Sequence, residues 1–288
     1  MVGQAFFNDP DDKTLSPSVM VLSTVQSAGK TTLISGLVRA FFANKKRILG
    51  VKPYELGTHR PMSGLGHFSE IGLGLGLPNS STQSVRTASA ASSDQEEMDY
   101  RTGQANGMSP LVLPNAAALT KSQWHLLLDT CQQLPYPSLI EGPGILSTPW
   151  GCVDDVWKTA LDVAGDLNYP VLLVTPKSVQ VMDHVLPAVA LCRDRGVDVL
   201  GWASVETRPM NADDTLLWQA LSVALYPETQ IPHLGTVPWM NTPLPVGDML
   251  GRVIEDAIDL LPLQYVLDDG VGWHARGNVQ MTEIEGRY

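Results

Sequence analysis

Three consecutive residues, Gly29-Lys30-Thr31, have the types and the order that hold phosphate groups in proteins. The apolar segment Ser18–Ser23 precedes them, and apolar residues at helical spacing follow as far as Ala43. A loop between a strand and a helix presents backbone N–H groups and the positive helix end to a phosphate. Lys30 would contact the β- and γ-phosphate oxygens, and the Thr31 hydroxyl would contribute to a Mg²⁺ shell. We therefore expect a nucleotide-binding loop formed by Thr24, Val25, Gln26, Ser27, Ala28, Gly29, Lys30, Thr31 and Thr32.

Two further charged residues end apolar segments that are typical of strands. Lys52 ends Arg47–Lys52 and is followed by a proline, which places it at the same carboxyl edge of a sheet as the phosphate loop. Glu141 ends Ser138–Glu141, and we expect the Gly-Pro-Gly turn after it to expose its carboxylate. Such a carboxylate beside a phosphate loop can bind Mg²⁺ or a water of its shell. A solvated side chain at a strand end is the alternative for both residues.

The segments that must position these residues alternate between strands and helices. The strand segments are short and apolar without alternation, which is typical of a parallel sheet covered on both faces. This pattern predicts an α/β fold with one continuous core. The expected strands are Ser18–Ser23, Arg47–Lys52, Ser138–Glu141, Pro170–Thr175, Val199–Ser204 and His233–Val237, and the expected helices are 30–43, 121–133, 154–165, 179–194, 212–225 and 248–261.

The chain divides into one main domain and three less regular parts. We expect an N-terminal extension over 1–16, a domain over 17–266 and a C-terminal tail over 267–288. Within the domain, residues 58–108 are rich in Gly, Ser, Thr and Ala, and too few of them are apolar to offset the entropy of ordering. We interpret this stretch as a partly flexible insertion.

Composition excludes several classes of function. The chain has 19 Lys and Arg against 30 Asp and Glu, a net charge of −11, so we expect no binding to nucleic acid. No apolar run approaches the roughly 20 residues of a membrane span, so no membrane association is expected. The acidic first residues do not resemble a signal peptide, and three cysteines without pairing or zinc spacing indicate reduced thiols. These features favour a cytoplasmic protein.

The order and spacing of the motifs resemble those of the ATP-dependent dethiobiotin synthetases over most of the chain. That family has TDTxxGKT at its first loop, KPxxSG after its second strand, then EGAGG, and later GW and LGxxPW. The resemblance implies a P-loop NTPase-like parallel sheet with helices on both faces in a single domain. The corresponding residues here are Thr24–Thr31, Lys52-Pro53 with Gly57, Ser69-Glu70, Ser109-Pro110, Glu141–Gly144, Pro170–Val174, Gly201-Trp202, Leu234-Gly235 and Pro238-Trp239.

The resemblance also implies a chemistry. In that family a diamine, 7,8-diaminononanoate, takes up CO₂ as a carbamate, ATP phosphorylates the carbamate, and the second amine closes a cyclic urea in biotin biosynthesis. By position, Lys30 and Lys52 would act on the transferring phosphoryl group, with ATP and Mg²⁺ as cofactors, in a homodimer. The resemblance would further place Thr31, Glu70 and Glu141 at the metal, Val205 and Pro238 at the nucleotide, and Leu56, Gly142, Pro143, Gly144 and Asp183 at the organic substrate.

Several positions differ from the family pattern. Val25 stands at an Asp of the loop, Leu56 at the Ser of KPxxSG, and Leu111 at a His. Val205 stands at the Asn that would bind adenine, which leaves the base preference open. Asp183 would repel a substrate carboxylate, so the organic substrate can differ as well. Three alternatives therefore stay open: a related amide-forming synthetase of the cobyrinic-acid type, a nucleotide-dependent switch that regulates a partner, and a ligand-binding pseudoenzyme.

Overall fold

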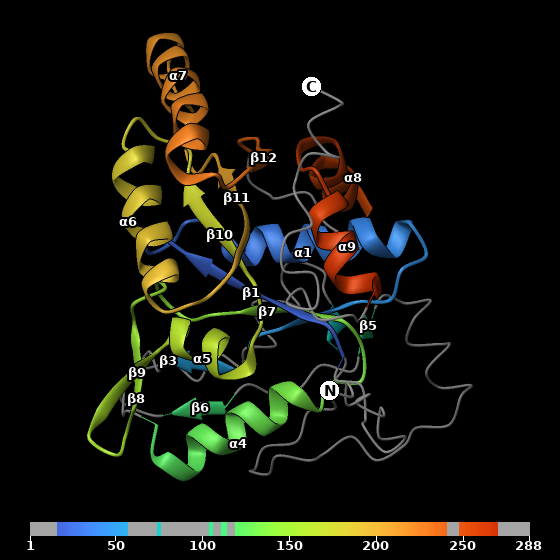
Figure 1. Ribbon diagram of the computed structural model, residues 1–288. Coiled ribbons are helices and arrows are strands. Elements are labelled where there is room, and N and C mark those ends of the chain that lie inside the picture. The colour runs from blue at the N-terminus through green and yellow to red at the C-terminus, as the bar shows by residue number, and fades with distance from the viewer. Residues whose placement is uncertain are drawn as a thin grey trace, which may run out of the picture.

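A computed structural model describes residues 16–56, 74–75, 104–105, 111–113, 119–240 and 248–269 (Figure 1). Its centre is a six-stranded sheet with the order β12-β11-β10-β1-β7-β2, in which every neighbouring pair is parallel. This sheet confirms the predicted α/β fold in a single domain. Its strands are β1 (Ser18–Ser23), β2 (Leu49–Val51), β7 (Ser138–Glu141), β10 (Val171–Pro176), β11 (Val199–Val205) and β12 (His233–Val237).

Strand β1 lies in the middle of the sheet, and all six of its residues are buried. Ser23 pairs with Val174 of β10 on one side, and Val21 pairs with Glu141 of β7 on the other. Burial on both faces explains why these strands are apolar throughout rather than alternating. Because the strands are parallel, the residues that follow their carboxyl ends meet at one edge, as predicted for Lys52 and Glu141.

Helices cover both faces of the sheet, and each face has its own apolar core, so the expectation of one continuous core is wrong. In Figure 1, α1 with α8 and α9 lies on one side of the strands, and α6 with α7 lies on the other. Helix α1 packs mainly on α8, and α6 packs on α7. The helices are α1 (Lys30–Ala43), α4 (Lys121–Gln132), α5 (Ala160–Leu167), α6 (Val181–Asp194), α7 (Ala212–Thr229), α8 (Asp248–Ala257) and α9 (Leu261–Asp269).

The predicted helix over 154–165 is wrong in its first half. An antiparallel hairpin, β8 (Pro149–Val153) and β9 (Val156–Thr159), occupies this part, and α5 begins only at Ala160. Asp154 and Asp155 form the turn with φ angles of 51° and 64°, a left-handed conformation that Asp tolerates better than most residues. The two residues with which the expected helix began therefore form a hairpin turn.

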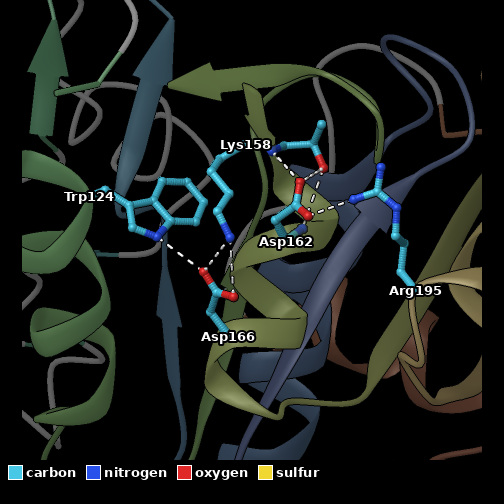
Figure 2. A network of polar contacts seen from close by, with 6 residues as sticks. Trp124, Lys158, Asp162, Asp166 and Arg195 are labelled. Carbon is cyan, nitrogen blue, oxygen red and sulfur yellow. Dashed lines mark hydrogen bonds and ion pairs between the residues drawn. The ribbon is translucent and has the colours of Figure 1, made fainter. Parts of the chain in front are cut away.

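A polar network joins this hairpin to its neighbours (Figure 2). The carboxylate of Asp166 accepts a hydrogen bond from the Trp124 indole at 3.1 Å and pairs with Lys158 at 3.2 Å. Asp162, which caps α5, accepts a hydrogen bond from Arg195 at 2.7 Å. These contacts connect α4, β9, α5 and the end of α6.

The C-terminal part contains a helix that the sequence pattern did not predict. The expected helix over 248–261 ends at Ala257, and a second helix, α9, runs from Leu261 to Asp269. Helix α9 therefore extends beyond residue 267, where we expected the C-terminal tail to begin. Leu263 and Leu267 of α9 are buried against the core that contains α1, which explains why the helix forms.

Two short parallel pairs of strands lie outside the main sheet. They are β3 (Tyr54–Leu56) with β6 (Leu111–Leu113), and β4 (Gly74–Leu75) with β5 (Gln104–Ala105). Most of the expected insertion over 58–108, the extension over 1–15 and the tail from 270 lie outside the described residues. Among the helices that the structure describes, none has the length and apolar character needed to span a membrane.

Candidate functional site

The predicted phosphate loop connects the central strand to α1. Thr24 continues from β1 and donates a backbone hydrogen bond to Val174 at 3.0 Å, and α1 begins at Lys30. Gly29 has a φ of 92°, a left-handed conformation that favours glycine, and a Cβ there would lie 2.7 Å from Val205 Cγ1. No side chain of the described residues caps the N-terminus of α1. Its first backbone N–H groups can therefore face an anion.

The ammonium group of Lys30 points to the carboxyl edge of the sheet. Its Nζ donates hydrogen bonds to Ser23 Oγ at 2.8 Å and to the Gly144 carbonyl at 2.6 Å. Only 8% of the residue is exposed, and this burial lowers the pKa of Lys30 below its ordinary value. The Glu141 carboxylate opposes this lowering of the pKa, and the Lys52 ammonium adds to it.

Lys52 lies close enough to Lys30 to affect its protonation, although it comes from another strand. It follows β2 directly, and Pro53, which comes next, is buried. The two ammonium groups therefore share one edge of the sheet, as expected from the sequence. Two cations at one site attract an anionic ligand, because each lowers the energy of a phosphate placed beside them.

The Thr31 hydroxyl contacts the Glu141 carboxylate. Its Oγ1 donates to Oε1 at 2.9 Å and to Oε2 at 3.1 Å. Glu141 is 4% exposed, so the expectation that its turn exposes the carboxylate is wrong. The hydroxyl and the carboxylate offer oxygen ligands of the kind that Mg²⁺ prefers. No group of three His, Cys, Asp or Glu side chains gathers within the described residues, so phosphate oxygens and water would supply the other ligands.

The other loop residues differ in exposure. Gln26 and Ser27 are exposed, Ala28 is buried, and Val25 and Thr32 are half-buried. The Thr24 hydroxyl is buried and has no hydrogen-bond partner in the described part of the chain. A buried hydroxyl without a partner is costly, so a ligand or water contact at Thr24 would be favourable.

The residues expected at the base and the organic substrate lie around the same edge. Val205 is buried against Gly29, and Pro238 follows β12 and is exposed. Asp183 is exposed in the first turn of α6. The turn after Glu141 begins with two buried residues, Gly142 and Pro143, and continues with half-buried Gly144. Glu70 and the side chain of Leu56 lie outside the described residues.

The structure adds polar residues that the sequence analysis did not select. Ser23 contacts Lys30, as described above. Glu206 follows β11, and its carboxylate pairs with Lys177 at 3.5 Å and accepts from the backbone N–H of Trp239 at 3.2 Å. Both Ser23 and Glu206 end or follow an apolar strand at the carboxyl edge. That position is the signal that could have identified them.

Comparisons with known proteins show which family the chain matches. Residues 17–243 match the AAA domain family, a range that includes the phosphate loop, Lys52, Glu141 and all six strands of the main sheet. The ATP-dependent dethiobiotin synthetase BioD of Marinobacter nauticus is 25% identical over 231 residues, covering 77% of this chain and 87% of that protein.

Two solved structures have lower similarity. The septum site-determining protein MinD of Pyrococcus horikoshii, complexed with Mg-ADP, is 14% identical to this chain, with a TM-score of 0.44. The match covers 94% of this chain and 100% of that MinD chain. A chain of the MinC:MinD cell division complex of Aquifex aeolicus is 15% identical to this chain, with a TM-score of 0.47. The match covers 82% of this chain and 86% of that chain.

Proposed function

We propose a reaction from one premise: the chain belongs to the AAA domain family, which contains dethiobiotin synthetase, and is an ATP-binding P-loop protein of that kind. The proposed reaction is the ATP-dependent carboxylation of a diamine, 7,8-diaminononanoate, followed by closure of a cyclic urea. One observation carries the proposal. Lys30 begins α1, Lys52 follows β2 and Glu141 ends β7, and their charged groups interact at one edge of the sheet.

The charges of this site fit the transfer of a phosphoryl group to a carbamate. One amine of the substrate adds to CO₂ and loses a proton, which gives a carbamate anion. The carbamate oxygen then attacks the γ-phosphorus of ATP, and the bond to ADP breaks. Both the nucleophile and the phosphate are anionic, so positive charge on each side of the reacting atoms lowers the barrier. Lys30 and Lys52 would supply that charge.

Ring closure needs only the substrate itself and a leaving phosphate. The second amine attacks the carbonyl carbon of the carbamic-phosphoric anhydride, the bond to phosphate breaks, and the amine loses a proton. The Gly142-Pro143-Gly144 turn lies beside Lys30 through the Gly144 carbonyl, so its backbone would line the space for the substrate. Holding both amines near one carbon turns ring closure into an intramolecular step.

Mg²⁺ would be held by Thr31 and Glu141, whose oxygens already lie together. When bound, the ion neutralises phosphate charge and fixes the orientation of the triphosphate. We assign Glu70 to the same role as part of this proposal. A homodimer and a cytoplasmic location also belong to the proposal, by analogy with the family.

The exposed carboxylate of Asp183 favours a second candidate. In the proposed site this residue would face the carboxylate of 7,8-diaminononanoate, and two negative charges repel. A substrate with no carboxylate beside Asp183 would avoid the repulsion. In a related amide-forming synthetase, the substrate carboxylate would instead lie at the phosphate groups, where it replaces the carbamate as the group that is phosphorylated.

A product assay tests the proposal. The protein is incubated with ATP, Mg²⁺, ¹³C-bicarbonate and 7,8-diaminononanoate, and the products are followed by mass spectrometry. The expected result is a cyclic urea that carries one ¹³C, with one ADP released for each urea. ADP release that does not depend on the diamine would contradict the proposal and favour a nucleotide-dependent switch. Binding of ATP without any turnover would favour a pseudoenzyme.

A further inference from the structure

We infer that Ser23 is a positioning residue, which holds the Lys30 ammonium where it meets the phosphate groups of a bound nucleotide. The inference rests on the proposed nucleotide site and assigns a role to a residue outside the phosphate loop. Ser23 is the last residue of β1 and is 0% exposed. Its main chain is fixed by the sheet, since it pairs with Val174 of β10.

Three polar groups form a closed set of hydrogen bonds around Ser23. Its Oγ donates to the Gly144 carbonyl at 2.8 Å and accepts from Lys30 Nζ at 2.8 Å. Lys30 Nζ also donates to the same carbonyl at 2.6 Å. An ammonium group has three N–H donors, and two of them are directed to these inward acceptors. The third is left for a phosphate.

A hydroxyl group suits this position because it can donate and accept at once. Alanine at position 23 would leave a buried cation with one acceptor fewer, which is costly at a site that is almost closed to water. Lys30 would then turn away from Ser23 toward water or toward Glu141. In either case its ammonium would leave the position that the phosphate loop requires.

Ser23 also fixes the turn that provides the second acceptor. Its backbone carbonyl accepts a hydrogen bond from the Leu146 N–H at 2.9 Å, two residues beyond Gly144. Gly144 itself has a φ of 64°, a left-handed conformation that favours glycine. The position of the Gly144 carbonyl therefore depends on the end of β1, and both acceptors of Lys30 are set by the same residue.

Ser138 provides a matched control. It is a second buried serine of the same sheet, 0% exposed, and its Oγ donates to the Tyr136 carbonyl at 2.7 Å. It lies at the start of β7, at the opposite end of the strands from the phosphate loop. Replacing either serine by alanine removes one buried hydroxyl, but only Ser23 touches Lys30.

Calorimetric titration with ADP in the presence of Mg²⁺ tests the inference on the full chain. We expect Ser23→Ala to raise the Kd for ADP at least about tenfold, the loss typical of a hydrogen bond to a charged group. Ser138→Ala should bind ADP like the wild type, and Ser23→Thr, which keeps the hydroxyl, should restore binding. Equal ADP affinity of Ser23→Ala and Ser138→Ala would overturn the inference.

Two further outcomes have a defined meaning. If the wild-type protein does not bind ADP, the proposed function itself is wrong, whatever the variants do. If circular dichroism shows that Ser23→Ala is unfolded, Ser23→Cys decides, because a thiol, although larger than a hydroxyl, fills the γ position and is only a weak acceptor. A weaker affinity of Ser23→Cys for ADP supports the inference, and wild-type affinity contradicts it.

Discussion

The Thr31 hydroxyl donates to both oxygens of the Glu141 carboxylate, at 2.9 and 3.1 Å, across 110 residues of sequence. Thr31 is the second residue of α1 and belongs to the phosphate loop, and Glu141 ends β7, the strand beside β1. This contact links the helix of the loop to the neighbouring strand. It also places two oxygen ligands together beside the position where the phosphate groups of a nucleotide would lie.

Loss of the Thr31 hydroxyl should remove the effect of Mg²⁺ on nucleotide binding. In Thr31→Val we expect the gain in ATP affinity on adding Mg²⁺ to fall at least about tenfold, because one oxygen ligand is absent. Thr215→Val serves as control, since Thr215 lies in α7, outside the phosphate loop, and its hydroxyl donates to the Asn211 carbonyl at 2.7 Å. Titrations with Mg²⁺ and with EDTA measure the effect, and an unchanged Mg²⁺ dependence in Thr31→Val would contradict the assignment.

Lys52 should matter for turnover more than for binding. We expect Lys52→Ala to lower kcat for the proposed reaction by about two powers of ten, about 3 kcal/mol of transition-state stabilisation. The affinity for ATP should stay close to that of the wild type, because Lys30 and the loop remain. Lys121→Ala is the control, since Lys121 forms a surface ion pair with Asp154. A Lys52→Ala variant with wild-type kcat would remove Lys52 from the catalytic site.

A methyl group at position 29 should disturb the loop through Val205. Gly29→Ala places a Cβ 2.7 Å from Val205 Cγ1 and also forces alanine into a φ of 92°. We expect a free energy of unfolding lower by about 2 kcal/mol. Val205→Ala removes the contact at 2.7 Å but leaves the Val205 Cβ at 3.0 Å and the backbone strain, so Gly29→Ala should cost less stability in a Val205→Ala background than in the wild type. Urea unfolding measures the loss of unfolding free energy caused by Gly29→Ala in each background. An equal loss in both would show that Val205 does not clash with the loop.

His233 should make the protein less stable in acid. Burial between Trp202 and Trp218 lowers the pKa of this imidazole from 6.5 to about 4. Between these values the unfolded chain binds the proton more readily than the folded one, so stability falls as the pH drops through this window. We expect about 2 kcal/mol of stability to be lost at His233 between pH 7.5 and pH 5.

A variant isolates this contribution. In His233→Phe the loss of stability between pH 7.5 and pH 5 should be smaller than in the wild type, because no group at position 233 takes up a proton. His125→Phe is the control, since His125 is exposed on α4. Urea unfolding at both pH values gives the comparison. An equal pH dependence of wild type and His233→Phe would rule out His233 as the source.

The parallel sheet could be predicted because its strands are buried on both faces and are therefore apolar throughout. The hairpin that contains Asp154 and Asp155 could not be predicted, because two acidic residues before an apolar segment are also typical of the start of a helix. Only the left-handed backbone of both residues distinguishes the two cases. Helix α9 was missed because it is only 9 residues long, and because the residues that it packs against belong to the core around α1, far away in the sequence.

The candidate site could be predicted only in part. The loop and Lys52 carry local signals, a glycine before a lysine and a lysine after a strand. The burial of Glu141 depends on Thr31, and the role of Ser23 depends on Gly144, which is 121 residues away. Contacts between distant residues leave no local pattern in a single sequence, so only the fold reveals them.

The central claim is that the main chain around Gly29 and the ammonium of Lys30 bind a polyphosphate, and calorimetric titration with Mg-ATP tests it most directly. We predict that the wild-type protein binds and that Lys30→Ala raises the Kd at least about a hundredfold. Lys158→Ala, which removes a partly buried lysine paired with Asp166 in the hairpin region, should bind like the wild type. Wild-type affinity in Lys30→Ala would contradict the account.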